Sequence, residues 1–172
     1  MLTTEQRPVL KAGILAETDP VFVTARTAGS SGEMADWFNV IATPSYFVRR
    51  SSLSRHDILT GTSSDNTTFT WTGAGYITRS QGERDAFREM FNSTGSVNPW
   101  LGTIQSAFND IFSGTGAAAV ANRTHILAMS RREATRGEKV FAVGLGTGAS
   151  PSVMGFEGDI TISDIDNALR LV

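Results

Sequence analysis

Residues 98–116 carry the strongest helix signal in the chain. Asn98 is a residue type that caps helix N-termini, Pro99 suits the first helical position, and Gly114 marks the end. Because a helix with one apolar stripe must bury it against other elements, a packed and mainly helical fold is expected. The stripe consists of Leu101, Ile104, Phe108, Ile111 and Phe112.

Apolar stripes and helix caps predict helices over four long ranges. These ranges are 4–16, 80–92, 98–113 and 122–142. Capping boxes, in which a Ser or Thr pairs with a residue three positions later, open the first two at Thr3 and Ser80. A further box at Thr135 lies inside the last range, so that helix either breaks near Ala134 or continues as a long rod.

Other segments are predicted to be extended or flexible. Phe69 and Trp71 alternate with threonines, which indicates a β ribbon near 67–78 with a turn at Gly73-Ala74-Gly75. The remaining predictions are short strands at 21–24 and 159–163, a flexible linker at 28–32, and short helices at 33–39 and from residue 54.

The fold class predicted from these elements is mainly α: a small helical bundle with a β-ribbon insertion and an extended C-terminal arm. A chain of 172 residues is the size of a single domain, so one domain over 1–172 is expected. Its parts would be an N-terminal helix and pliable segment over 1–53, a helical body over 54–143, and the arm with a short helix over 144–172.

Charge and amino-acid usage exclude several functions. The chain has 15 Lys and Arg against 17 Asp and Glu, so no electrostatic field is available to hold a phosphate backbone non-specifically. It has no cysteine, which excludes disulfides, thiolate metal sites and thiol nucleophiles. No signal-peptide pattern and no long apolar run is visible, so we expect no membrane partner.

Residues 144–149, Gly-Leu-Gly-Thr-Gly-Ala, formally match a dinucleotide-binding fingerprint. Such a loop follows the first strand of a βαβ unit and opens a helix. Here few residues follow, and Pro151 stands where the helix would continue. We therefore favour a flexible connector and expect no cofactor, with a small nucleotide-binding enzyme as an alternative.

The sequence contains only weak candidates for a group of catalytic or metal-binding residues. Ser54, His56 and Asp57 are the residue types of a hydrolase triad, but near neighbours in sequence do not converge on one reacting atom, and a helix cap explains them better. His125 has no second ligand at metal-site spacing, so a core or surface role is favoured. We predict no catalytic residue, no metal and no enzymatic activity.

Two arginine clusters could contact DNA phosphates or acidic partners. Solvated faces and salt bridges explain such clusters more often. The clusters are Arg49, Arg50 and Arg55, and Arg131, Arg132 and Arg136.

Large apolar residues in short segments outside the long helices are the candidate subunit-interface residues. Such segments bury poorly alone, and aromatic residues are favoured at interface centres. Two alternatives stay open, because the residues could be covered within this fold or by neighbouring copies of the chain. The candidates are Trp37, Phe38, Phe47, Phe69, Trp71, Tyr76, Met154 and Phe156.

Three stretches of the sequence carry a resemblance: Arg88-Glu89-Met90-Phe91, residues 134–142, and residues 151–158. Together they resemble small structural proteins of tailed bacteriophages, found in virion morphogenesis clusters. The likeness runs from about Tyr76 to Leu171 and is strongest toward the C-terminus. It brings no functional-site motif with it.

The resemblance implies a head-to-tail connector of the adaptor type, a small helical protein assembled as a ring, often of twelve subunits. Its partners would be further copies of itself, the portal protein, and a tail, stopper or terminator protein. Packaged DNA would pass the lumen without specific binding, and the protein, made in the host cytoplasm, would lie in the virion neck. A β ribbon departs from the helical pattern of adaptors and would be an inserted loop. A tail-completion or tail-terminator protein of the same virion and a DNA-binding regulator are further alternatives.

Overall fold

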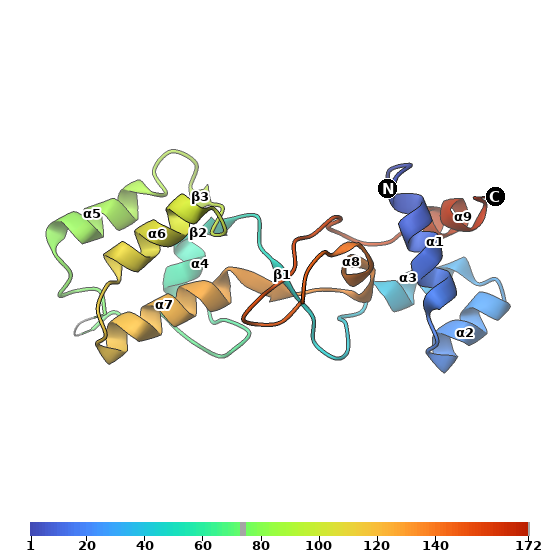
Figure 1. Cartoon of the computed structure of the whole chain (residues 1–172), viewed down its shortest axis with the longest axis horizontal. Coiled ribbons are helices and arrows are strands. Elements are labelled where there is room, and N and C mark those ends of the chain that lie inside the picture. Colours follow the sequence, from blue (N-terminus) through green and yellow to red (C-terminus); the bar gives the residue numbers. More distant parts are fainter. Residues whose placement is uncertain (73–74, 172) are drawn as a thin grey trace. The chain divides into compact units, whose positions relative to one another are not determined.

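The computed structural model describes residues 1–72 and 75–171, and this part of the chain is mainly helical (Figure 1). The chain forms two compact units: unit 1 combines Met1–Val48 with Glu133–Val172, and unit 2 is Arg49–Arg132. The chain passes between units within two short paired strands, β1 (Phe47–Arg49) and β4 (Arg131–Glu133). Unit 2 is thus inserted into unit 1, with boundaries that differ from the expected body over 54–143.

Unit 1 packs helices from both ends of the chain around one hydrophobic core. Its helices are α1 (Gln6–Ala16), α2 (Pro20–Thr27), α3 (Ser31–Phe38), α8 (Arg136–Phe141) and α9 (Ile162–Leu169). The prediction of helices over 4–16 and 33–39 is confirmed. The core includes Leu10, Ile14, Phe22, Met34, Phe38, Phe141, Ile160 and Ile165.

Helix α2 replaces the strand predicted at 21–24, and that prediction is wrong. The carboxylate of Asp19 accepts a hydrogen bond from the Val21 N–H at 2.9 Å, and Pro20 occupies the first turn. An Asp cap followed by Pro starts a helix, and this outweighs the β preference of two valines. Phe22 and Ala25, three positions apart, are then both buried.

The linker predicted at 28–32 is instead a tight helix-to-helix turn. Ser30 donates its N–H to the Ala25 carbonyl at 2.9 Å, and Gly29 donates to the Arg26 carbonyl at 3.1 Å. Gly29 has φ +69°, so it is the left-handed residue of a Schellman motif. The presence of glycine at position 29 is therefore explained by the termination of α2 and not by a need for flexibility. Helix α3 starts two residues later.

The extended C-terminal arm expected over 144–172 is also wrong, because α9 belongs to the core of unit 1. Ile165 and Ala168 are fully buried, and α9 packs on α1 and α3. The strand predicted at 159–163 is absent from these described residues. There the side chain of Asn39 forms two hydrogen bonds with the Ile160 backbone, at 2.8 and 3.0 Å, and thereby satisfies both backbone groups.

Unit 2 packs its helices around a second core that is rich in phenylalanine. Its elements are β2 (Leu53–Ser54), α4 (Arg55–Thr60), α5 (Gln81–Glu89), β3 (Ser96–Val97), α6 (Gly102–Ile111) and α7 (Ala117–Met129). Strands β2 and β3 are antiparallel, with Leu53 opposite Val97. The capping boxes at Ser54 and Ser80 are both formed, which confirms the predicted starts of α4 and α5. The core includes Leu53, Ile58, Phe69, Tyr76, Phe87, Phe108, Phe112 and Ile126.

The β ribbon predicted near 67–78 is wrong for the described part of that range, which contains no strand. Gly73 and Ala74 of its predicted turn lie outside the described residues. The backbone of Thr70 bonds instead to a side chain: its N–H donates to Asn122 Oδ1 at 2.7 Å, and its carbonyl accepts from Asn122 Nδ2 at 3.1 Å. Because a buried amide on α7 supplies these bonds, the segment needs no partner strand.

The bounds of the two long predicted helices differ from the prediction, and in both cases side-chain hydrogen bonds explain the difference. The helix predicted over 98–113 begins later, at Gly102. Asn98 accepts a hydrogen bond from the Trp100 N–H in a turn, and the Trp100 indole donates to the Ser130 carbonyl at 2.7 Å. These bonds hold the segment before Gly102 outside the helix. For the range 122–142 the sequence left a break and an unbroken rod open; the structure has a break, with α7 beginning at Ala117 and ending at Met129, followed by β4 and α8. The capping box of Thr135 and Glu138 starts α8 and confirms the break.

Candidate subunit interface

The apolar loop, residues 143–153, joins α8 to the C-terminal part of unit 1. Val143 and Val153 exchange two backbone hydrogen bonds, at 2.9 and 3.0 Å, which close the loop at its base. Phe47 of β1 donates its N–H to the Gly146 carbonyl at 2.8 Å and so ties the middle of the loop to a strand. The flexible connector predicted here is therefore an ordered loop.

The ring of Tyr46 supports this loop from one side. A Cβ atom at Gly146 would lie 2.0 Å from that ring, and Gly146 has φ +65°. Both the close approach and the left-handed backbone therefore require glycine at this position. The Tyr46 hydroxyl shares a 2.7 Å hydrogen bond with Ser152 Oγ and donates to the Gly144 carbonyl at 3.3 Å. Gly146, one of the glycines that suggested a phosphate-binding loop, thus serves close packing.

Three aliphatic side chains of the apolar loop face solvent. Val143 and Leu145 are 75% and 74% exposed, and Val153 is 51% exposed. Apolar side chains gathered on an ordered loop are characteristic of contact surfaces, since little conformational entropy is lost when such a loop binds. We did not predict these residues from sequence, although aliphatic residues set between glycines in a loop are the signal that could have found them.

The α6–α7 groove, on unit 2, is a second apolar feature. It has a volume of about 310 Å³ and is lined by Phe108, Ile126 and Leu127, with Arg123 among the polar lining residues. Leu127 is 42% exposed in it. The groove combines these apolar side chains with polar ones, among them Gln105, Asn109 and Thr124.

Trp37 lines two clefts of unit 1, of about 290 and 590 Å³. Arg136 contributes to both, and its guanidinium lies 4.2 Å from the centre of the Trp37 ring. Val21, 73% exposed, lines the larger cleft. The smaller cleft is more polar than the α6–α7 groove, whereas the larger cleft is more apolar than the groove.

The eight predicted interface residues fall into three groups. Phe38, Phe69 and Tyr76 are buried in the cores of their own units. For these three residues, the structure favours the alternative that they are covered within the fold. Trp71 is 43% exposed, although its ring lies 5.3 Å from Phe69. The remaining four, all half-buried, are Trp37, Phe47, Met154 and Phe156.

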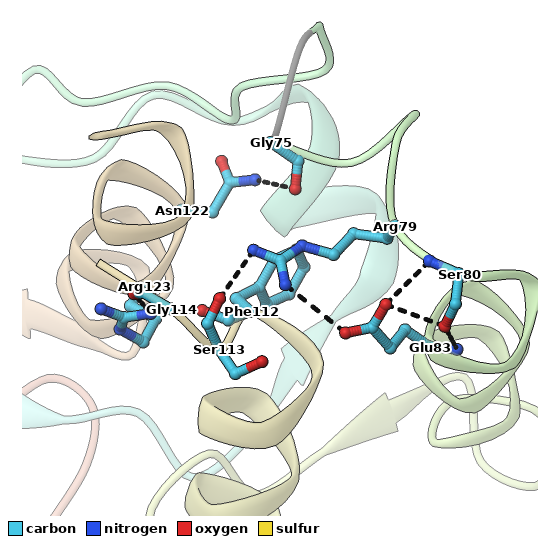
Figure 2. A network of polar contacts seen from close by, with 9 residues as sticks. All are labelled: Gly75, Arg79, Ser80, Glu83, Phe112, Ser113, Gly114, Asn122 and Arg123. Carbon is cyan, nitrogen blue, oxygen red and sulfur yellow. Dashed lines mark hydrogen bonds and ion pairs between the residues drawn. The ribbon is translucent and has the colours of Figure 1, made fainter. Parts of the chain in front are cut away.

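A polar network in unit 2 surrounds the C-terminal end of α6 (Figure 2). Arg79 donates to the Ser113 carbonyl at 2.9 Å, and Arg123 of α7 donates to the carbonyls of Phe112 and Gly114. The last carbonyls of a helix lack helical partners, and the helix dipole favours positive charge beside them. Both arginines therefore stabilise the packing of α6 in unit 2.

Ser54, His56 and Asp57 form a helix cap and not a triad. Ser54 Oγ donates to the Asp57 carboxylate at 2.7 Å, and this hydrogen bond lowers the pKa of Asp57 against the opposing effect of burial. The exposed ring of His56 faces the Thr60 hydroxyl at 3.3 Å. A lowered carboxyl pKa suits a cap, because the ionised form accepts hydrogen bonds from the first turn.

His125 is fully buried in α7 and bridges two segments of unit 2. Its Nε2 lies 2.8 Å from the Ile58 carbonyl, and its Nδ1 lies 3.1 Å from the Thr67 hydroxyl. A histidine with both nitrogens engaged is a structural core residue. No group of three or more His, Asp or Glu suited to a metal ion occurs within residues 1–72 and 75–171.

Residues 144–149 lack the geometry of a dinucleotide-binding loop. That motif places its glycines at the start of a helix, whose N–H groups bind the pyrophosphate. The next helix here, α9, begins at Ile162, and the glycines belong to the apolar loop described above. The nucleotide-binding alternative therefore has no structural support at these residues.

The two arginine clusters meet in part through strand pairing. Arg49 and Arg131 lie on the paired strands β1 and β4, and Arg50 donates its N–H to the Ser130 carbonyl at 2.9 Å. Arg131 forms an ion pair with Asp65, and Arg49 stacks over Trp100 at 4.7 Å. Several of these arginines thus have partners inside unit 2.

Comparison of the chain with protein families, with curated proteins and with solved structures gives no match. Among the described residues, no helix combines the length and the apolar character needed to cross a bilayer.

Proposed function

We propose that the chain is a structural component of a tailed-phage virion, a head-to-tail connector adaptor that forms a ring between portal and tail. Its work would be mechanical: joining neighbouring subunits while DNA passes through the lumen. The partners would be further copies of the chain, the portal protein, and a tail, stopper or terminator protein.

The apolar loop is the observation that supports this proposal most directly. It exposes Val143, Leu145 and Val153 while its backbone is closed by hydrogen bonds and packed on Tyr46. An exposed apolar surface on an ordered loop suits a protein that functions by contact with other proteins. Capped helices and polar groups engaged in the fold, such as His125, fit the same view.

Electron microscopy of phage particles made without this protein tests the proposal. A connector adaptor predicts heads that have packaged DNA and then lose it, with tails absent from them. Complete, DNA-filled heads bearing abnormal tails would instead support a tail-completion or tail-terminator protein. Absence of the chain from purified virions would contradict both assignments.

A further inference from the structure

The two units of the chain carry opposite formal charge. Unit 1 holds eleven Asp and Glu against six Lys and Arg, whereas unit 2 holds six acidic residues against nine basic ones. Their formal charges are −5 and +3, in keeping with −2 for the chain. Unit 1 of one molecule is therefore attracted to unit 2 of another, and long-range attraction of this kind orients proteins as they meet.

The apolar loop belongs to unit 1 and the α6–α7 groove belongs to unit 2, so the two surfaces lie on units of opposite net charge. The loop projects Val143, Leu145 and Val153 from the acidic unit, and the groove lies on the basic unit with Phe108 and Leu127 in its lining. The basic Arg123 also lines the groove, and its guanidinium is held by two carbonyls of the α6 terminus (Figure 2). The chain thus contains an uncharged apolar loop on the acidic unit and a groove with apolar lining residues on the basic unit.

We infer that the apolar loop of one copy docks in the α6–α7 groove of a second copy, with Leu145 against Leu127. This inference rests on the proposed function, since it names the surfaces by which the ring would close. The contact is heterologous, so each copy still has one free loop and one free groove, and repetition produces a ring if the rotation closes. A second copy is favoured over another occupant because the unit that carries the loop and the unit that carries the groove have opposite net charge within this same chain.

Engineered cysteines test the contact directly, because the chain has no cysteine of its own. A Leu145→Cys variant and a Leu127→Cys variant, one carrying a tag that changes its size, are mixed and oxidised. Docking predicts a mixed disulfide at least fivefold more abundant than either homodimer. Its yield falls at 1 M NaCl, where attraction between exposed charges is screened.

Leu169→Cys is the matched control for Leu127→Cys, since Leu169 is 38% exposed and lies on α9 of unit 1. Val21→Cys reports on the larger cleft of unit 1. Equal pairing of Leu145→Cys with Leu169→Cys, or preferred pairing with Val21→Cys, overturns the assignment of the groove. A disulfide that forms only within single chains of the double variant Leu127→Cys/Leu145→Cys also overturns it.

A Leu145→Asp variant separates this inference from the proposed function. We expect at least a tenfold weaker self-association, measured by analytical ultracentrifugation, with the far-UV circular dichroism of the parent protein. If the variant associates as well as the parent, or if virions contain the chain without the mixed disulfide forming, the docking inference fails and the connector proposal stands. If purified virions lack the chain, the connector proposal itself fails.

Discussion

The backbone N–H of Leu2 donates a 2.7 Å hydrogen bond to the carboxylate of Asp164, and both residues are buried. The bond joins the segment before α1 to the first turn of α9, across 162 positions of sequence. The same carboxylate accepts from the backbone and the hydroxyl of Thr161 in the cap of α9. One side chain therefore links both ends of unit 1.

Replacement of Asp164 by Asn is expected to lower the free energy of unfolding by about 2 kcal/mol, the size of a hydrogen bond to a charged group. The neutral amide presents donors where Thr161 also donates, so part of the cap is lost. Urea denaturation measures the change. Asp159→Asn, at an exposed position of the same segment, is the control and should shift the midpoint little.

Asp164 also predicts acid sensitivity of unit 1. Burial raises its pKa, but the hydrogen bonds from Leu2 and Thr161 outweigh burial, so the pKa lies below the usual value. A carboxyl with a lowered folded pKa contributes stability above its unfolded pKa, near 3.9, and loses that contribution as the pH falls through both values. Denaturation from pH 6 to pH 2 should show a smaller loss of stability in Asp164→Asn than in the parent. Equal losses would contradict the assignment.

Gly146→Ala is expected to release the apolar loop from Tyr46. The new Cβ would lie 2.0 Å from the ring, in addition to the strain of alanine at φ +65°. Gly29→Ala is a matched control, because Gly29 has φ +69° and open space around it, so only about 1 kcal/mol of backbone strain arises. Hydrogen exchange of residues 143–153 should accelerate in Gly146→Ala and stay unchanged in Gly29→Ala.

Asn122→Ala should destabilise unit 2 by about 3 kcal/mol, because three hydrogen bonds of about 1 kcal/mol are lost. The fully buried amide serves the Thr70 N–H and the carbonyls of Thr70 and Gly75. Faster hydrogen exchange at Thr70, with unit 1 unaffected, would support this role. Asn109→Ala, exposed on α6, controls for loss of an asparagine and should leave exchange as it is.

Thr135→Ala removes the cap that starts α8 and should cost about 1 kcal/mol. Thr135 Oγ1 accepts from the Glu138 N–H at 3.1 Å, and the carboxylate of Glu138 is buried and also accepts from the Gly158 N–H. Thermal unfolding measures the loss. Thr135→Ser keeps the hydroxyl and should retain most of the stability, whereas equal effects of both variants would argue against the cap.

Local patterns predicted the helices well, since caps and apolar stripes act within a few residues. The boxes at Ser54, Ser80 and Thr135 all form where the sequence places them. The predicted ribbon failed because its backbone partner is Asn122, a side chain about 50 positions away. The sequence left open whether the interface candidates are covered within the fold, because the burial of Phe69 or Tyr76 depends on which helices pack over them.

The sequence by itself determined the mainly helical character of the chain and its lack of cysteine chemistry, because propensity, capping and residue usage are local properties. Only the tertiary structure decided that the C-terminal residues complete the core of unit 1, that unit 2 is inserted, and that Val143, Leu145 and Val153 stay exposed. These features depend on contacts between residues far apart in sequence, such as Leu2 with Asp164. The pattern of apolar residues within one segment carries no information about such contacts.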